Sequence, residues 1–326
     1  MKKISLFLLC ILCVIGLSAC GNQDVKTVDA VSQELEQHFS VGVLLPDVGL
    51  GDQSFNDLAI KGLVKARDNL DIIWAYQDLN TSKSLEEGLA ELMSANHDVI
   101  IGVGYSVQEM LEQVATEHPE QRFVLVDTIS DVPNIDSIVF KENEGSYLAG
   151  VVAAMTSTSD IIGFVGGMED PVILKFLEGY REGAQSVKPD IEVLVAYANT
   201  YSDDQVGAQL AREMITKQAD VLYAAAGYTG VGLLQEAQKQ KVFAIGVDSD
   251  QYFYAEKAVV TSMLKNIDVA VYNYLESLMN NTDQSQMLLE FGINEDGVDL
   301  APIRVIPNAI EMEEKIIQVK SQITTK

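Results

Sequence analysis

The chain has 326 residues, of which 48% are hydrophobic, and this length is enough for two hydrophobic cores of ordinary size. Its formal net charge is −26, and a surface that acidic repels nucleic acid and anionic lipid headgroups. The composition therefore argues against a DNA- or RNA-binding protein and against attachment to a membrane by charge alone.

The first residues are predicted to direct the chain out of the cytoplasm. Two lysines precede an apolar run from Ile4 to Leu17, which is too short to span a bilayer as a stable helix. The run ends in Leu17-Ser18-Ala19-Cys20, which resembles a bacterial lipobox. We expect a signal peptide over 1–19, a lipidated Cys20 and a polar tether over 20–39, on the outer face of the cell membrane. The alternative is an uncleaved anchor or a buried helix.

Cysteine and histidine usage argues against a metal site. The three cysteines lie at positions 10, 13 and 20, so two leave with the signal peptide and the lipid uses the third. The three histidines, at positions 38, 97 and 118, lack metal-ligand spacing. We expect no metal, no cofactor and no thiol nucleophile.

From Val41 onward, short apolar runs alternate with helix-length segments, which is typical of a parallel sheet flanked by helices. The predicted strands are 41–45, 72–76, 99–103, 123–126, 138–140, 162–165, 191–197, 221–225, 243–247 and 259–263. The first strand leads into a Gly-rich loop, Pro46 to Asn56, at the start of a helix, where an open α/β sheet binds small ligands. This loop carries an aromatic ring, an amide and carboxylates, so a neutral polar ligand with a flat face is expected.

An internal repeat divides the chain into two similar halves. A shift of 121 positions superposes Phe55 on Phe176, Gly62 on Gly183 and Asp127 on Asp248. Two similar α/β lobes imply a cleft between the strand ends, and both aspartates end strands at that edge. The alternatives are chance matches for the repeat and helix capping for the aspartates.

An ordered set of motifs then resembles a known family. The motifs are Ser54-Phe55-Asn56, Glu144 to Gly150, Ile162 to Gly167, Gly227 to Gly230 and Gly246 to Gln251. Together with the lipobox they are similar to the Bmp (basic membrane protein) family of substrate-binding lipoproteins, and within it to purine nucleoside receptors of ABC transporters. The resemblance covers the chain from Val41 to about Ile317.

The resemblance implies an α/β type I periplasmic-binding-protein fold, with two doubly wound parallel-sheet lobes and a hinge crossed three times. The crossings are expected near 140–142, 250–252 and 286–290. The N-terminal lobe would then comprise 40–141 plus 252–285, and the C-terminal lobe 142–251 plus 286–326.

The resemblance also implies a ligand-binding set. Phe55 and Tyr201 would hold the base between two rings. The polar contacts would come from Asp47, Asn56, Asp127, Gly227, Asp248 and Lys265. From the residues alone, each of four residues has an alternative: a core residue for Phe55, an exposed loop residue for Tyr201, a turn residue for Asp47 and a solvated lysine for Lys265. The segment Gly49-Leu50-Gly51 departs from the family pattern, and we expect base preference to be set there.

The function expected from the sequence is a lipid-anchored solute-binding protein without enzymatic activity. It would capture a nucleoside, with a purine implied by the resemblance, and deliver it to an ABC permease in the membrane. The alternative on the same fold is a sensor or surface lipoprotein that binds a nucleoside or sugar. An enzyme is disfavoured because the chain shows no Ser-His-Asp spacing, free cysteine or metal cluster.

Overall fold

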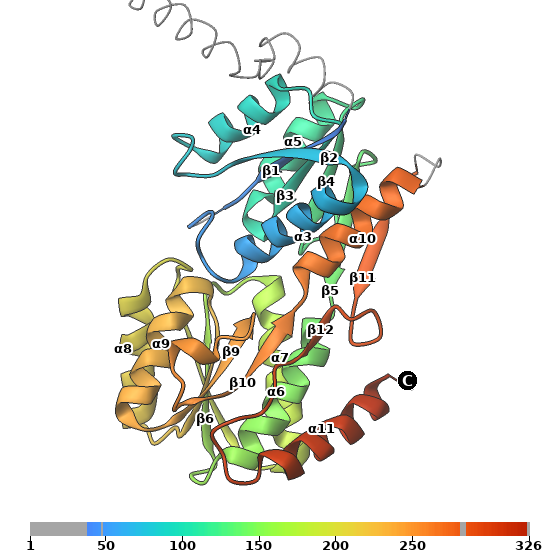
Figure 1. Cartoon of the computed structure of the whole chain (residues 1–326). Helices are drawn as coiled ribbons and strands as arrows, with labels where there is room; N and C mark the ends of the chain where they lie inside the picture. The colour runs from blue at the N-terminus through green and yellow to red at the C-terminus, as the bar shows by residue number, and fades with distance from the viewer. Residues whose placement is uncertain (1–37, 47, 281–284, 325–326) are drawn as a thin grey trace, which may run out of the picture. The chain divides into compact units, whose positions relative to one another are not determined.

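Two six-stranded sheets, each flanked by helices, form the two lobes of this computed structural model (Figure 1). The structure describes residues 38–46, 48–280 and 285–324. The predicted signal peptide, the lipidated Cys20 and the tether up to residue 37 lie outside the described residues, and so does Asp47. Within the described part of the chain, no helix has the length and apolar character that a membrane span requires.

The first lobe is built on an all-parallel sheet with the strand order β11-β5-β4-β3-β1-β2. Its strands are β1 (Phe39–Leu44), β2 (Ile72–Gln77), β3 (Val99–Val103), β4 (Arg122–Val126), β5 (Ile135–Phe140) and β11 (Leu288–Phe291). Its helices are α3 (Phe55–Leu70), α4 (Leu85–Ser94), α5 (Gln108–Glu117) and α10 (Ile267–Asn280), with a short 3-10 turn η2 (Tyr105–Val107). Every residue of β3 is buried, as expected for an apolar strand covered on both faces.

The second lobe repeats this plan with the strand order β12-β10-β9-β8-β6-β7. Its strands are β6 (Ile161–Gly166), β7 (Glu192–Tyr197), β8 (Val221–Ala225), β9 (Phe243–Asp248), β10 (Val259–Lys265) and β12 (Val298–Leu300), of which β12 is antiparallel to β10. Its helices are α6 (Glu142–Thr156), α7 (Pro171–Val187), α8 (Asp204–Thr216), α9 (Gly227–Gln240) and α11 (Ala309–Ile323), with a 3-10 turn η3 (Tyr252–Tyr254).

The strand orders show the repeat directly. The order β5-β4-β3-β1-β2 in the first sheet matches β10-β9-β8-β6-β7 in the second, and β9 begins at Phe243, 121 residues after β4 begins at Arg122. Equivalent glycines allow equivalent helix contacts. A Cβ on Gly62 of α3 would lie 2.8 Å from a backbone oxygen of α10, and one on Gly183 of α7 would lie 2.0 Å from a backbone oxygen of α6. The predicted fold class is confirmed.

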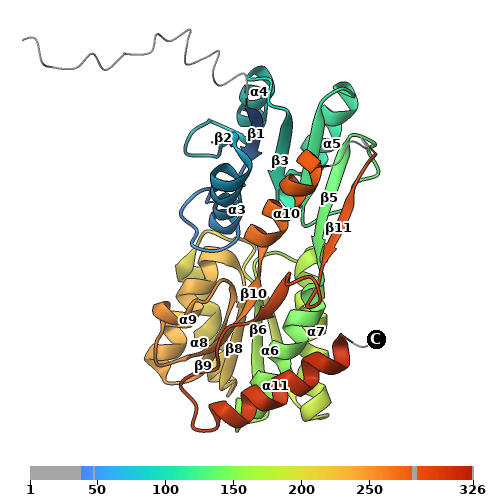
Figure 2. The same ribbon diagram turned by 45° about the vertical axis from the view of Figure 1, so that its right-hand side comes forward.

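The structure corrects the predicted lobe boundaries (Figure 2). The family resemblance implied that 252–285 belongs to the first lobe, but β10 is hydrogen-bonded to β9 and β12 in the second sheet. The second crossing therefore follows Lys265, where α10 packs on α3, and not 250–252. The third crossing lies between β11 and β12, and not at 286–290, because β11 pairs with β5 in the first sheet. Apolar periodicity identifies a strand but not the sheet that receives its hydrogen bonds.

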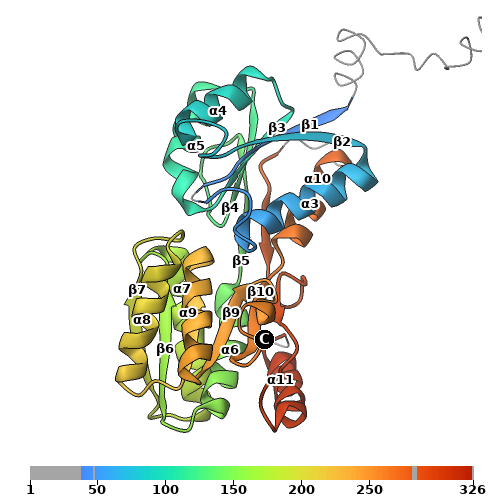
Figure 3. The same cartoon turned by 60° about the vertical axis from the view of Figure 1, so that its left-hand side comes forward.

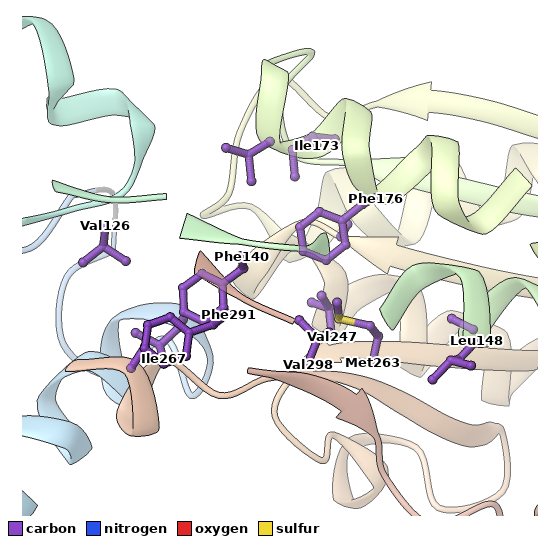
Figure 4. Packing of buried hydrophobic residues seen from close by; sticks show 14 of the residues in the cluster. Val126, Phe140, Leu148, Ile173, Phe176, Val247, Met263, Ile267, Phe291 and Val298 are labelled. Atoms are coloured by element: carbon purple, nitrogen blue, oxygen red, sulfur yellow. The ribbon is translucent and has the colours of Figure 1, made fainter. Parts of the chain in front are cut away.

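Apolar side chains fill the region where the crossings pass from one lobe to the other (Figure 4). The ring of Phe140, the last residue of β5, lies 5.8 Å from the ring of Phe291, the last residue of β11. Ile267 and Val298, next to the other crossings, belong to the same buried cluster. This packing places the ends of β5, β10 and β11 close together, beside the cavity described next.

Candidate functional site

The carboxyl ends of both sheets face each other between the lobes (Figure 3). The residues at these ends line a cavity of about 650 Å³. Its volume falls within the range of small-molecule sites, and its position is the one at which open α/β sheets bind ligands. Asp127 directly follows β4, Asp248 ends β9 and Lys265 ends β10, so three strand ends deliver charged groups to one place.

The cavity lining contains every predicted ligand-binding residue that the structure describes. These residues are Phe55, Asn56, Asp127, Tyr201, Gly227, Asp248 and Lys265. Asp47 lies outside the described residues, although its neighbours Pro46 and Val48 line the cavity. The structure thus brings the predicted set together, and the contacts of these residues with a ligand stay a prediction.

Asp127 and Asp248 occupy equivalent positions with equivalent backbones. Their φ angles are +79° and +64°, in the left-handed region that residues other than glycine rarely adopt, and both side chains are buried. Neither residue is the N-cap of the helix that follows it, because Lys141 is the N-cap of α6 and Gln251 is the N-cap of η3. The helix-capping alternative is therefore wrong, and a strained backbone at two matching strand ends indicates a functional constraint.

Lys265 is the centre of a buried charge cluster. Its Nζ lies 2.7 Å from both carboxylate oxygens of Asp127 and 3.0 Å from Oε1 of Glu142, and the residue is only 1% exposed. The same nitrogen lies 4.9–5.5 Å from the ring centres of Phe55, Phe140 and Phe176, within cation–π range. The prediction that Lys265 lies at the cavity holds, and the alternative of a solvated lysine is wrong.

Burial and charge act against each other in this cluster. Burial lowers the pKa of Lys265, but Asp127, Glu142 and Asp248 outweigh it and raise the pKa above its usual range, so the ammonium stays charged. Burial raises the pKa of Asp127 to about 6, although Lys265 opposes the shift. Burial also raises the pKa of Asp248, against the effects of Lys265 and a hydrogen bond from Ser54. The cavity therefore holds carboxylates that protonate more easily than exposed ones.

Sequence reasoning missed two neighbours of Lys265. Glu142, the first residue of α6, is fully buried and also lies 3.5 Å from Nζ of Lys175, yet the polar stretch around it is typical of an exposed helix start. Phe176 lines the cavity from α7. The repeat gave a signal for Phe176, because it superposes this residue on Phe55.

The two predicted rings are positioned by close backbone contacts. Phe55 is the first residue of α3, and a Cβ on Gly104 would approach its ring to 3.3 Å. The ring of Tyr201 lies against Gly167, where a Cβ would come within 2.0 Å of it, and its hydroxyl donates to Oδ2 of Asp170 at 2.9 Å. Both rings thus belong to the cavity wall.

The loop before α3 is organised by Asp52. Its carboxylate is buried and accepts the backbone N–H groups of Ser54, Asn56 and Asp57 at 2.8–3.1 Å, which satisfies the start of the helix. Burial raises the pKa of Asp52 to about 6. The side chain of Asn56 donates to the backbone oxygen of Pro46 at 3.2 Å, and its Oδ1 is buried without a hydrogen-bond partner.

The charge of the lining restricts the ligand. Among the described lining residues, the carboxylates are Asp52, Asp127, Glu169, Asp170 and Asp248, and the cation is Lys265. Such a wall accepts hydroxyl and amine donors and repels anions. The described residues include no group of three or more His, Cys, Asp and Glu side chains placed to hold a metal ion.

Comparison with known proteins places the chain in a family. The model of the Bmp family, described as the PnrA-like substrate-binding proteins of ABC transporters, matches residues 39–326. The chain belongs to the Bmp family. This result confirms the resemblance seen in the sequence, and Bmp proteins bind the solute for an ABC transporter, so this chain is a binding protein and not an enzyme.

Relatives of this Bmp protein match over most of their length. It is 33% identical over 309 residues to the "CD4+ T-cell-stimulating antigen" of Listeria innocua, covering 87% of this chain and 86% of the relative. It is 30% identical over 330 residues to the "ABC transporter nucleoside-binding protein BmpA" of Lactococcus lactis, covering 94% and 92%. "Basic membrane protein B" of Borreliella burgdorferi is 32% identical over 285 residues, covering 83% and 81%.

Solved structures confirm the type I periplasmic-binding fold. An ABC-transporter solute-binding protein of Aeropyrum pernix K1 superposes with a TM-score of 0.74 at 30% identity, covering 87% of this chain and 85% of that one. The Lac repressor superposes with a TM-score of 0.64 at 14% identity, over 86% of each chain, which shows the shared fold alone.

Proposed function

We propose that this Bmp protein captures a nucleoside, with a purine as the base, between its two lobes and delivers it to the permease of an ABC transporter. The observation that carries the proposal is the joint presence, in one cavity, of two flat rings and two strand-end carboxylates from opposite lobes. A nucleoside combines a flat base with a diol-bearing sugar, and this lining offers a partner for each part.

The sugar is assigned to the carboxylates. An ionised carboxylate is an acceptor with two oxygens, so Asp127 or Asp248 is suited to accept from two vicinal hydroxyls. Lys265 is a donor that balances these charges, and its position between the lobes suits a ring or hydroxyl oxygen. The excess of carboxylates argues for a nucleoside over a nucleotide, because a phosphate would meet several negative charges.

The base is assigned to Phe55 and Tyr201. Stacking a base on an aromatic side chain contributes roughly 1–3 kcal/mol, and it tolerates different bases because each base has a flat face. The unpartnered Oδ1 of Asn56 is placed to accept a hydrogen from the edge of a base.

Base preference is assigned to the loop before α3. Gly49 and Gly51 have φ angles of +71° and +103°, which favour glycine, and Asp78 accepts the N–H of Leu50 between them at 3.2 Å. Val48 of the same loop lines the cavity. A loop held in this way presents a fixed surface to the base.

Attachment to the membrane is assigned to a lipid on Cys20, within Leu17-Ser18-Ala19-Cys20. Several relatives are named basic membrane proteins, which supports a membrane location. A lipid anchor on the outer face of the cell membrane would hold the binding protein near its permease.

Isothermal titration calorimetry tests the ligand assignment. The full chain, purified in detergent, is titrated with adenosine, guanosine, inosine, uridine and ribose, and we expect the purine nucleosides to bind most tightly. Phe55→Ala and Asp248→Ala should each weaken binding strongly. Ile310→Ala is the control, because this apolar residue of α11 is 76% exposed and lies outside the cavity lining.

The proposal fails if no nucleoside binds the native chain, or if both cavity variants bind as tightly as the native chain does. Delivery to the permease is tested separately, by measuring the uptake of radiolabelled nucleoside in cells that lack the gene. Unchanged uptake with intact binding would favour a ligand sensor over a transport protein.

A further inference from the structure

A hydrogen bond joins the two lobes at Ser54. Its Oγ donates to Oδ2 of Asp248 at 2.5 Å, although the two residues are 194 positions apart in the chain. Ser54 precedes α3 in the first lobe, whereas Asp248 ends β9 in the second. Ser54 is fully buried and is not part of the cavity lining, whereas Asp248 is. The hydroxyl of Ser54 is therefore linked to the cavity lining through Asp248.

The hydroxyl of Ser54 does not cap α3, although the position of the residue before this helix predicts that role. Ser54 is the N-cap residue of α3, and a serine there ordinarily accepts a backbone N–H of the first turn. Here the side chain makes no capping hydrogen bond, because Asp52 accepts the backbone N–H groups of Asn56 and Asp57. Asp52 also accepts the N–H of Ser54 itself. The backbone N–H groups at the start of α3 thus have Asp52 as their acceptor. The hydroxyl of Ser54 can therefore bond to the other lobe.

The residue before Ser54 makes two more bonds to the second lobe. The hydroxyl of Ser249 donates to the backbone oxygen of Gln53 at 3.1 Å, and the hydroxyl of Tyr254 donates to Oε1 of Gln53 at 2.9 Å. Gln53 has a φ of +51°, and Asp57 accepts its backbone N–H at 2.9 Å. A strained residue that is held by its own lobe and bonded twice to the opposite lobe is typical of a contact under functional constraint.

We propose that Ser54 is a positioning residue for ligand capture: its hydroxyl joins the lobes on closure and holds the Asp248 carboxylate in the orientation that receives the ligand. Closure and capture are then coupled, because the same carboxylate serves the inter-lobe bond and the ligand. Gln53 and Tyr254 add a second, weaker link beside it. The inference rests on the proposed function for the identity of the ligand, whereas the joining of the lobes does not depend on it.

Stopped-flow dissociation measures the coupling, because a ligand enclosed between two lobes leaves only after they open. The full chain in detergent is loaded with labelled guanosine or adenosine. It is then mixed with an excess of the same nucleoside without the label. Ser54→Ala should raise the dissociation rate by about tenfold to 100-fold, the range expected for a lost hydrogen bond to a charged group. Tyr254→Phe, which keeps the ring and removes only the hydroxyl, should raise it by roughly threefold.

Ser137→Ala is the matched control. This hydroxyl is also buried, but it accepts the backbone N–H of Ser130 within the first lobe at 3.1 Å. The control should lose thermal stability to a similar extent and keep the native dissociation rate. The positioning role is overturned if Ser54→Ala releases the nucleoside at the native rate, whatever the rate of Tyr254→Phe, or if Ser137→Ala releases it as fast as Ser54→Ala.

Amide hydrogen exchange without ligand separates this inference from the proposed function. Ser54→Ala should speed exchange in both segments that the bond connects, 52–57 and 248–254, whereas Ser137→Ala should not. Unchanged exchange in both segments would overturn the joining of the lobes. Faster exchange in a protein that binds none of the nucleosides would support the inter-lobe bond and refute the nucleoside assignment.

Discussion

Replacement of Lys265 by methionine tests the buried charge cluster, because methionine is of similar length and carries no charge. The native ammonium lies 2.7 Å from Asp127 and 3.0 Å from Glu142. In the variant, Glu142 would keep Lys175, whose Nζ lies 3.5 Å away, as an ion-pair partner. Asp127 would lose its ion pair with Lys265. Breaking a buried ion pair by removing one partner costs about 3–5 kcal/mol. We expect Lys265→Met to lower the free energy of unfolding by that amount at pH 8.

The penalty should shrink at lower pH. Burial raises the pKa of Asp127 to about 6 even with Lys265 beside it, and Lys265 opposes that rise, so the variant should have a still higher pKa at Asp127. A carboxyl whose pKa is raised by folding contributes stability at low pH, and this contribution is lost as the pH rises through the raised pKa. Relative to the native chain, Lys265→Met should therefore regain stability between pH 8 and pH 5.

Urea unfolding at pH 5 and pH 8 measures both effects, and Lys61→Met is the control. Nζ of Lys61 lies 2.6 Å from Asp268, but the lysine side chain is 68% exposed, and such surface pairs contribute about 0–1 kcal/mol. The reasoning is refuted if Lys265→Met costs no more than Lys61→Met at pH 8. It is also refuted if the cost of Lys265→Met is the same at both pH values.

Three further predictions concern the ring contacts and the anchor. Phe55→Leu should weaken nucleoside affinity by roughly 5- to 150-fold in calorimetry, since stacking contributes roughly 1–3 kcal/mol, and native affinity would contradict the stacking role. Gly167→Ala places a Cβ within 2.0 Å of the Tyr201 ring and should displace it, so affinity should fall by about tenfold; unchanged affinity would argue against a ring contact from Tyr201. The native chain should incorporate radiolabelled fatty acid in cells and Cys20→Ala should not, and equal incorporation by both proteins would refute lipid attachment at Cys20.

The repeat was the strongest guide to the fold. It predicted two similar lobes, and the matching strand orders confirm them. Applied to β5 as well, the same shift would have made β10 the equivalent of β5. It would then have placed 259–265 in the second sheet. The short strands β11 and β12, of four and three residues, were missed because each is only partly buried and carries little apolar pattern.

The site was predictable where a residue stands in a motif and unpredictable where only the tertiary structure gives it a partner. Phe55, Asp127 and Asp248 follow predicted strands, so their meeting at the sheet edges follows from α/β topology. The burial of Glu142 against Lys265 and the bond from Ser54 to Asp248 depend on how the chain crosses between the lobes. Local sequence does not encode such contacts.

Mass spectrometry of the small molecules released on denaturing the purified full chain tests the central claim most directly. The account predicts that the native chain carries a purine nucleoside, close to one per protein, and that Asp248→Ala, prepared in parallel, carries much less. Release of a free sugar or of no nucleoside by the native chain, or of equal amounts of nucleoside by both proteins, would contradict the account.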